Sequence, residues 1–218
     1  MWQIRPMGEA ALLIECDEPD MGLANRLVLS LSKAIDRSKL NGVMPAVPAI
    51  ASLIVRFDPL VQSPILIEAA IDRLARYLEP APEIPDRIVE IPTRFGGEWG
   101  KDLPQVADTL GLAQADIIET LCERPYRVMC IGFAVGHPYI GPLPPALHLP
   151  RRSTPRSSVP KGRVAMAAGL ANVYPAQLPG GWHLIGHTEL SLFDPNRTRR
   201  PSLLAAGDGV RFVPISTT

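Results

Sequence analysis

The stretch from Gly132 to Trp182 most constrains the fold of this chain, because it is unusually rich in glycine and proline. Proline fixes φ and lacks a backbone donor, and glycine adopts conformations closed to other residues. Such a segment builds shaped loops, which often carry functional groups, and not long regular elements. Its charged and aromatic side chains predict a surface for an anionic or amide-like small molecule: Arg151, Arg152, Arg156, Lys161, Arg163, His137, Tyr139 and Tyr174.

The part of the chain from residue 93 to residue 218 predicts a β-domain. Two short helices are expected first, over 102–110 and about 114–123, and helical periodicity is absent after them. Many short strands separated by turn residues are typical of a sandwich or barrel. The strand candidates are Tyr126–Ile131, Gly162–Ala167, Trp182–Ile185, Glu189–Phe193 and Val210–Val213.

Residues 1–92 predict a separate α/β domain. One helix is capped by Asp20 and has an apolar face at every fourth position, and a second helix starts at Ser63-Pro64. The expected strands are Ala10–Cys16, Val43–Ile50, Ser52–Asp58 and Ile88–Ile91. The order β-α-β-β-α-β is the ferredoxin-like pattern, with an additional N-terminal strand left open. The chain as a whole is therefore expected to be an α+β protein of two domains.

Composition excludes several classes of protein. The chain has 22 basic and 22 acidic residues, so nothing favours nucleic-acid binding, which is usually accompanied by a basic excess. No apolar run approaches the length of a membrane span. Cys16, Cys122 and Cys130 are far apart and form no C-x-x-C pair, so free buried thiols are expected. These features predict a cytoplasmic protein without a metal site.

The candidate chemistry rests on arginine and histidine. An arginine fork matches a carboxylate or phosphate in two-point contact, although Arg151, Arg152 and Arg156 could also form a solvated loop or bridge to a partner. His137 could serve as a general acid or base. His183 and His187 could share a strand face, but no third metal ligand is evident. Neither a P-loop nor a G-x-S-x-G motif is present.

Several runs carry a resemblance to a known family. They are GFAVGHPYIGPLP, LPRRSTPRSSVPKGRVAMAAG, VYPAQLPGGWHLIGHT and GDGVRFVPI, together with GEAAL near the start and IPTRFGGEW after residue 90. The chain resembles the family of KipI and the 5-oxoprolinase B subunit, also described as allophanate hydrolase subunit 1 or the carboxyltransferase-domain B half. The resemblance covers essentially the whole sequence.

This resemblance implies a small α/β domain followed by a cyclophilin-like β-barrel. It implies a homologous C subunit and an A subunit as partners, and ATP as a cofactor that a partner could bind. It also implies ATP-dependent cleavage of 5-oxoproline to glutamate. The predicted catalytic residues are Arg156, which belongs to the retained arginine framework, and His137, which together with His187 could substitute for a lost polar group of the family. The implied substrate-binding residues are Phe133, Tyr139, Arg151, Arg152, Tyr174, Trp182 and His187.

The chain departs from the family pattern at several loop positions. Leu170–Asn172 replaces a Gln-Thr-Gly run, and His187 stands where an arginine is usual. The other departures are Val135 for proline, His137 for phenylalanine, Lys161 for alanine and Leu121 for histidine.

Three functions follow from the resemblance. The first is a hydrolase subunit acting on a small amide or carboxylate. The second is a regulatory protein that binds a histidine kinase, as KipI does. The third is a diverged subunit of urea or allophanate metabolism.

Overall fold

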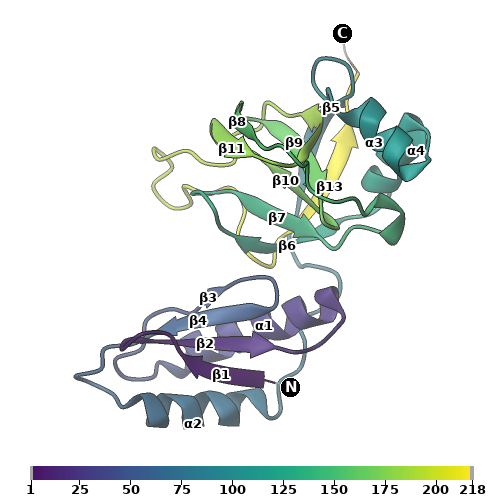
Figure 1. Ribbon diagram of the computed structural model, residues 1–218. Helices are drawn as coiled ribbons and strands as arrows, with labels where there is room; N and C mark the ends of the chain where they lie inside the picture. The colour runs from purple at the N-terminus through teal and green to yellow at the C-terminus, as the bar shows by residue number, and fades with distance from the viewer. Residues whose placement is uncertain (1, 217–218) are drawn as a thin grey trace. The chain divides into compact units, whose positions relative to one another are not determined.

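The computed structural model describes residues 2–216, and its internal contacts divide the chain into two units, between Glu83 and Ile84. The N-terminal unit is a four-stranded antiparallel sheet with two helices, and the C-terminal unit is a closed barrel (Figure 1). None of the helices in residues 2–216 is long and apolar enough to span a bilayer. The expected mixed architecture of α/β domain plus barrel is therefore confirmed.

The sheet of the N-terminal unit has the strand order β1-β2-β4-β3. Strand β2 is buried at every second residue, at Leu12, Ile14 and Cys16, so one sheet face enters the core. Helix α1 is capped by Asp20, whose Oδ1 accepts a 2.6 Å hydrogen bond from Leu23 N. The elements are β1 (Trp2–Pro6), β2 (Ala11–Cys16), α1 (Met21–Ser38), β3 (Val47–Pro48), β4 (Ser52–Arg56) and α2 (Pro64–Ala75).

The expected β-α-β-β-α-β order of this unit is wrong at its end. The strand expected at Ile88–Ile91 is β5 (Ile88–Phe95), which lies parallel to β13 (Gly209–Pro214) and therefore belongs to the barrel. The sheet edge next to β2 is taken by β1, which pairs with β2 along its whole length. The additional N-terminal strand thus replaces the last strand of the pattern, and the expected boundary near residue 92 falls inside a barrel strand.

The barrel closes in the order β10-β7-β6-β13-β5-β12-β9. Helices α3 (Leu103–Leu110) and α4 (Gln114–Cys122) precede β6, as the sequence predicts, and α4 packs against β13. The remaining strands are β6 (Tyr126–Ile131), β7 (Pro138–Gly141), β9 (Arg163–Ala167), β10 (Leu170–Val173) and β12 (His183–His187), with a separate two-stranded ribbon of β8 (Arg156–Val159) and β11 (Leu178–Gly180).

Two features of the barrel differ from the expected strands. The strand expected over Glu189–Phe193 is absent from the described residues, where Phe193 forms only an isolated bridge to Ser202. Strands β7, β8, β10 and β11 are not evident from the sequence, because each has only three or four residues and several contain proline or glycine. Short strands of this composition carry too little periodic signal to be distinguished from loops.

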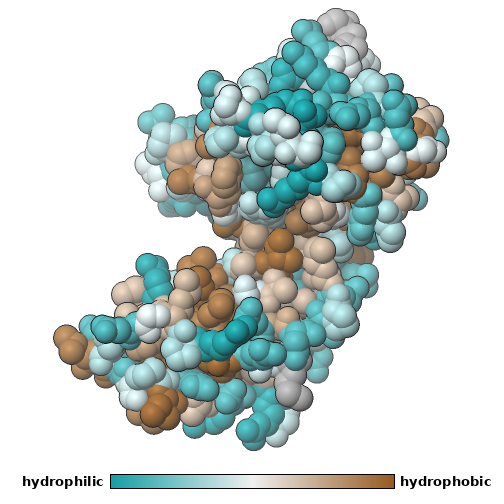
Figure 2. Space-filling view, in the orientation of Figure 1, coloured by the Kyte–Doolittle hydropathy of each residue, from teal (hydrophilic) through white to brown (hydrophobic). Residues whose placement is uncertain are grey.

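The surface of the N-terminal unit exposes several large apolar side chains. Leu60, Ile65 and Leu66 lie at and before the start of α2, and Leu60 is 95% exposed. Figure 2 shows brown hydrophobic patches among hydrophilic residues on this unit. Exposed apolar patches are typical of surfaces that contact other proteins.

Candidate functional site

A cavity of about 260 Å³ lies in the barrel unit, within the segment from Gly132 to Trp182 that the sequence singled out. Its wall contains seven of the nine side chains expected in the site. The lining residues are Phe133, His137, Tyr139, Arg151, Arg152, Pro155, Asn172, Tyr174, Pro179, Gly180, Gly181 and Trp182. The fold therefore brings most of the predicted site residues to one place, whereas Arg156 and His187 make other contacts.

Aromatic rings form one wall of this cavity. The ring of His137 lies 5.3 Å from that of Tyr139 and 5.4 Å from that of Tyr174, and Tyr139 in turn meets Trp182 edge-on at 5.8 Å. Offset and edge-to-face contacts of this kind stabilise a fixed arrangement of rings. Burial raises the pKa of the Tyr139 and Tyr174 hydroxyls, so both remain protonated at neutral pH.

Gly180 is required by this arrangement. A Cβ atom at Gly180 would lie 2.0 Å from the Tyr174 hydroxyl oxygen, which is far inside van der Waals contact. The Gly-Gly-Trp run thus allows β11 to approach the buried tyrosine closely, and any larger residue at Gly180 would displace the aromatic wall.

His137 is neutral at physiological pH. Its side chain is almost completely buried, with the whole residue 2% exposed. Burial lowers the pKa of the imidazole from 6.5 to about 4, because the charged form would lose its hydration. A neutral imidazole offers one hydrogen-bond donor and one acceptor, so His137 suits recognition of a polar group better than donation of a proton as an imidazolium.

Arginine supplies the positive charge of the cavity. The Arg151 guanidinium lies 5.8 Å from the centroid of the Trp182 ring, a cation–π contact that leaves its N–H groups available to a ligand. Arg152 also lines the cavity, and its backbone N donates a 2.8 Å hydrogen bond to Gly181 O. Two forks on one rim favour a ligand that carries a carboxylate or phosphate.

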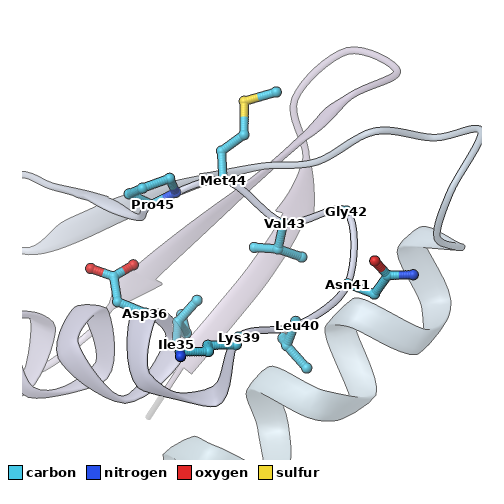
Figure 3. Close-up of a pocket in the computed structure, with 9 residues that line it drawn as sticks. All are labelled: Ile35, Asp36, Lys39, Leu40, Asn41, Gly42, Val43, Met44 and Pro45. Carbon is cyan, nitrogen blue, oxygen red and sulfur yellow. The ribbon is translucent and has the colours of Figure 1, made fainter.

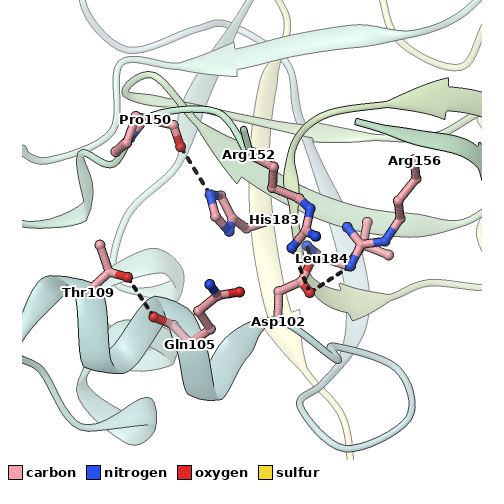
Figure 4. Close-up of polar contacts among 8 residues, drawn as sticks. All are labelled: Asp102, Gln105, Thr109, Pro150, Arg152, Arg156, His183 and Leu184. Atoms are coloured by element: carbon pink, nitrogen blue, oxygen red, sulfur yellow. Dashed lines mark hydrogen bonds and ion pairs between the residues drawn. The ribbon is translucent and has the colours of Figure 1, made fainter. Parts of the chain in front are cut away.

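Asp102 holds two of the arginines (Figure 4). Its Oδ1 accepts hydrogen bonds from Arg156 Nη2 at 2.7 Å and from Arg152 Nη1 at 3.4 Å, and its Oδ2 accepts one from Leu184 N at 2.7 Å. Burial would raise the pKa of this carboxyl, but the hydrogen bonds from Arg156 and Leu184 and the two positive charges together lower it. One carboxylate against two arginines leaves a net positive charge beside the cavity.

His187 lies in a different cluster, at the opposite end of β12 from Trp182. Its ring stacks on Trp99 at 4.9 Å, and its Nε2 lies 3.1 Å from Glu189 Oε1. The guanidiniums of Arg94 and Arg163 lie 5.7 Å and 5.4 Å from the same Trp99 ring. We therefore leave His187 out of the proposed binding site.

Two residues of the site are missed by sequence reasoning. The sequence marks Asp102 only as the start of a helix, yet its carboxylate contacts side chains about fifty positions later in the chain. Asn172 stands out only as a departure from a glycine, and it lines the cavity from β10. Neither position carries a local signal, because the contacts depend on how the barrel closes. Among residues 2–216, no group of three or more His, Cys, Asp or Glu side chains could hold a metal ion.

A second cavity, of about 450 Å³, lies in the N-terminal unit (Figure 3). Its wall is the end of α1 and the following loop, from Ile35 to Pro45. The Asp36 carboxylate at this wall already accepts a 2.9 Å hydrogen bond from Ala46 N, which fixes the loop. This cavity has no cluster of charged or aromatic groups comparable to that of the barrel.

Comparison with known proteins agrees with this architecture. A family described as "Carboxyltransferase domain, subdomain C and D" matches residues 2–204. The B subunit of 5-oxoprolinase from Escherichia coli O157:H7 is 40% identical over 211 residues, covering 95% of this chain and 94% of that protein. The protein of the same name from Bacillus subtilis (strain 168) is 37% identical over 226 aligned positions, covering 99% and 93% of the two chains.

Two solved structures extend the comparison. The protein TTHA0988 superposes with a TM-score of 0.80 at 36% identity, over 96% of this chain and 40% of that one, so the present chain spans less than half of it. The urea carboxylase of Kluyveromyces lactis superposes with a TM-score of 0.81 over 99% of this chain and 22% of its own, at 19% identity, which shows a shared fold.

The fold and the sequence matches define a carboxyltransferase-domain protein. The chain belongs to the family of carboxyltransferase domains, subdomains C and D, and the curated relatives reported above are 5-oxoprolinase B subunits.

Proposed function

We propose that this chain is the B subunit of a heteromeric 5-oxoprolinase, which hydrolyses the cyclic amide of 5-oxoproline to glutamate with ATP. The observation that carries the proposal is the cavity of the barrel unit, which combines an arginine rim with a neutral, aromatic wall. 5-Oxoproline has the matching chemistry, a carboxylate on a small ring that contains an uncharged amide. The name of the two relatives supports the same substrate.

The residues of the cavity then have distinct roles. Arg151 and Arg152 bind the substrate carboxylate, and Tyr139, Tyr174 and Trp182 enclose the ring. Arg156 acts indirectly, since it contacts the Asp102 carboxylate that also contacts Arg152. His137 contacts the amide as a neutral group.

The partner subunits are proposed to bind ATP. The cavity of about 260 Å³ is smaller than the range of about 300–1,000 Å³ typical of ligand pockets, and suits a lactam better than a nucleotide. The sequence also lacks the Gly-Lys-Ser/Thr of a P-loop, whose backbone would cradle phosphates. The homologous C subunit and an A subunit would complete the assembly.

The proposal is tested by purifying this chain with the C and A subunits and measuring ATP-dependent glutamate release. Arg151→Ala should raise KM about ten- to a hundred-fold, because a hydrogen bond to a charged group contributes about 1.5–3 kcal/mol. The matched control is Arg211→Ala, an exposed arginine on β13, which should leave KM unchanged. Failure of the complete assembly to release glutamate, or an unchanged KM in Arg151→Ala, would contradict the proposal.

A regulatory role is the second candidate. Phe133 and Val135 are each 65% exposed, and Phe133 lines the cavity. Two exposed apolar side chains on one loop suit contact with a protein, such as the dimerisation domain of a histidine kinase. Pull-down with such domains tests this role, and the double variant Phe133→Ser, Val135→Ser should abolish capture. Absence of binding at micromolar concentration would count against it.

A further inference from the structure

Three buried side-chain polar atoms in the wall of the barrel cavity have no hydrogen-bond partner among residues 2–216: Nε of Arg152, Nδ1 of His137 and Oδ1 of Asn172. The last two atoms belong to uncharged side chains, and His137 and Asn172 are only 2% and 1% exposed. Buried polar atoms are nearly always paired in native proteins, so unpaired atoms around one cavity point to a ligand that supplies the partners.

The chemistry of each atom is defined by its surroundings. His137 is enclosed by aromatic rings, with Phe133 at 5.5 Å in addition to Tyr139 and Tyr174, and burial keeps the imidazole neutral by lowering its pKa to about 4. One ring nitrogen of a neutral imidazole is therefore a donor and the other an acceptor.

Asn172 offers an acceptor to the cavity. It lies in β10, where its backbone pairs with Ala165 of β9. The Oδ1 atom is an amide oxygen and can only accept. A ligand group facing it must therefore carry an N–H or O–H donor, and a carboxylate oxygen at this position would be repelled.

We propose that His137 and Asn172 together recognise the N–H and C=O edge of a secondary amide in a small cyclic ligand. The ligand N–H donates to Asn172 Oδ1, and the ligand carbonyl oxygen accepts from the N–H at Nδ1 of His137. The inference rests on the proposed function for the identity of the ligand as 5-oxoproline, but the pair would read the same edge in any lactam.

This pairing also sets the orientation of the ligand. The positive charge of the cavity lies with Arg151 and Arg152, whereas His137 and Asn172 are uncharged. A ligand that carries both a carboxylate and an amide would thus place the carboxylate at the arginines and the amide against β10. The reverse orientation would bring the carboxylate to the Asn172 oxygen and leave the arginines with a neutral group.

The test compares three ring compounds that differ in one group. 5-Oxoproline has the carboxylate and the amide, cyclopentanecarboxylate lacks the amide, and N-methyl-5-oxoproline carries a methyl group in place of the N–H donor. Binding is measured by calorimetry with the full chain purified together with its C subunit. The wild-type protein should bind 5-oxoproline at least about ten-fold more tightly than either analogue, because a site built for a polar group rejects analogues that leave it unpaired.

Two variants test whether the preference for 5-oxoproline depends on His137 and Asn172. His137→Phe keeps an aromatic ring, and Asn172→Leu keeps a side chain of similar size. Each should reduce the preference for 5-oxoproline to near unity while the affinity for cyclopentanecarboxylate stays within two-fold. A wild-type protein that binds N-methyl-5-oxoproline as tightly as 5-oxoproline would overturn the inference without any variant.

The outcomes separate this inference from the proposed function. If 5-oxoproline binds but the variants retain its preference over cyclopentanecarboxylate, the amide-reading pair is wrong and the substrate assignment survives. If 5-oxoproline does not bind while the lactam 2-pyrrolidone binds in a manner that His137→Phe abolishes, the pair stands and the substrate assignment is wrong. Absence of binding by both lactams would overturn the inference.

Discussion

The Oδ1 atom of Asp102 lies 2.7 Å from Nη2 of Arg156, so a carboxylate at the start of α3 is joined to strand β8. The same carboxylate accepts a hydrogen bond from Leu184 N in β12. Three segments that are distant in the sequence are thus tied together by one side chain, which is 6% exposed as a residue.

Asp102→Ala should destabilise the protein by about 3 kcal/mol, because it leaves two partly buried arginines and the buried Leu184 N without their acceptor. Asp102→Asn should lower the free energy of unfolding by about half as much, because an amide oxygen can still accept a hydrogen bond from Leu184 N. Urea unfolding measures both. The control is Asp194→Asn, whose pair with Arg197 is exposed at 3.7 Å and should contribute less than about 1 kcal/mol. Equal midpoints for Asp102→Ala and Asp194→Asn would contradict the assigned role.

The stability of the protein should fall as the pH decreases from 6.5 to 4. The pKa of His137 is about 4 in the folded protein and 6.5 without burial, so unfolding takes up a proton within this window. The free energy of unfolding should decrease by about 3 kcal/mol across it. The Asp102 contribution is separable, because its lowered pKa means that its stabilisation is lost only as the pH falls below the ordinary value of 3.8.

Urea midpoints measured between pH 4 and pH 7 check this dependence. The His137→Phe variant has no imidazole to protonate, so its free energy of unfolding should depend less on pH between 4 and 7. If the variant and the wild-type protein show the same slope, the imidazole of His137 is not the group responsible.

Replacing Ala168 with glycine should stabilise the turn between β9 and β10. Ala168 has a φ of +51° and Gly169 a φ of +73°, in a two-residue loop that an L-residue adopts only with strain. Ala168→Gly should raise the free energy of unfolding by up to about 1 kcal/mol. Gly169→Ala should lower it by about 2 kcal/mol, because a Cβ would also lie 2.9 Å from His148 Nε2. Thermal unfolding measures both variants. If their melting temperatures shift in the same direction relative to the wild-type protein, this explanation is contradicted.

His187→Ala should leave ligand affinity within two-fold of the wild-type value, because His187 stacks on Trp99 away from the cavity. The variant should lose about 1 kcal/mol of stability from the ring contact. Trp182→Ala, which removes a cavity wall, is the matched comparison and should weaken binding by more than ten-fold. Calorimetry with 5-oxoproline distinguishes the two, and comparable losses would place His187 in the site after all.

The extent to which the sequence anticipates this protein differs between its two units. The capped helix α1, the Ser63-Pro64 start of α2 and the helices α3 and α4 are all expected, because caps and 3.6-residue periodicity are local signals. The sequence does not predict which sheet contains the strand at Ile88–Phe95, because the alternating residues of this strand fit either sheet. Pairing with β13, more than a hundred positions later, decided that it belongs to the barrel.

The sequence by itself indicated that the stretch from Gly132 to Trp182 would line the candidate site, because its glycines and prolines favour shaped loops and its arginines suit an anionic group. Only the tertiary structure decided which side chains share the cavity. Barrel closure brings Asn172 to His137 and Asp102 to Arg156, and it carries His187 away from Trp182 along β12. The physical reason is that residue type and local spacing encode backbone conformation and chemical capacity, whereas proximity depends on strand pairing between distant segments.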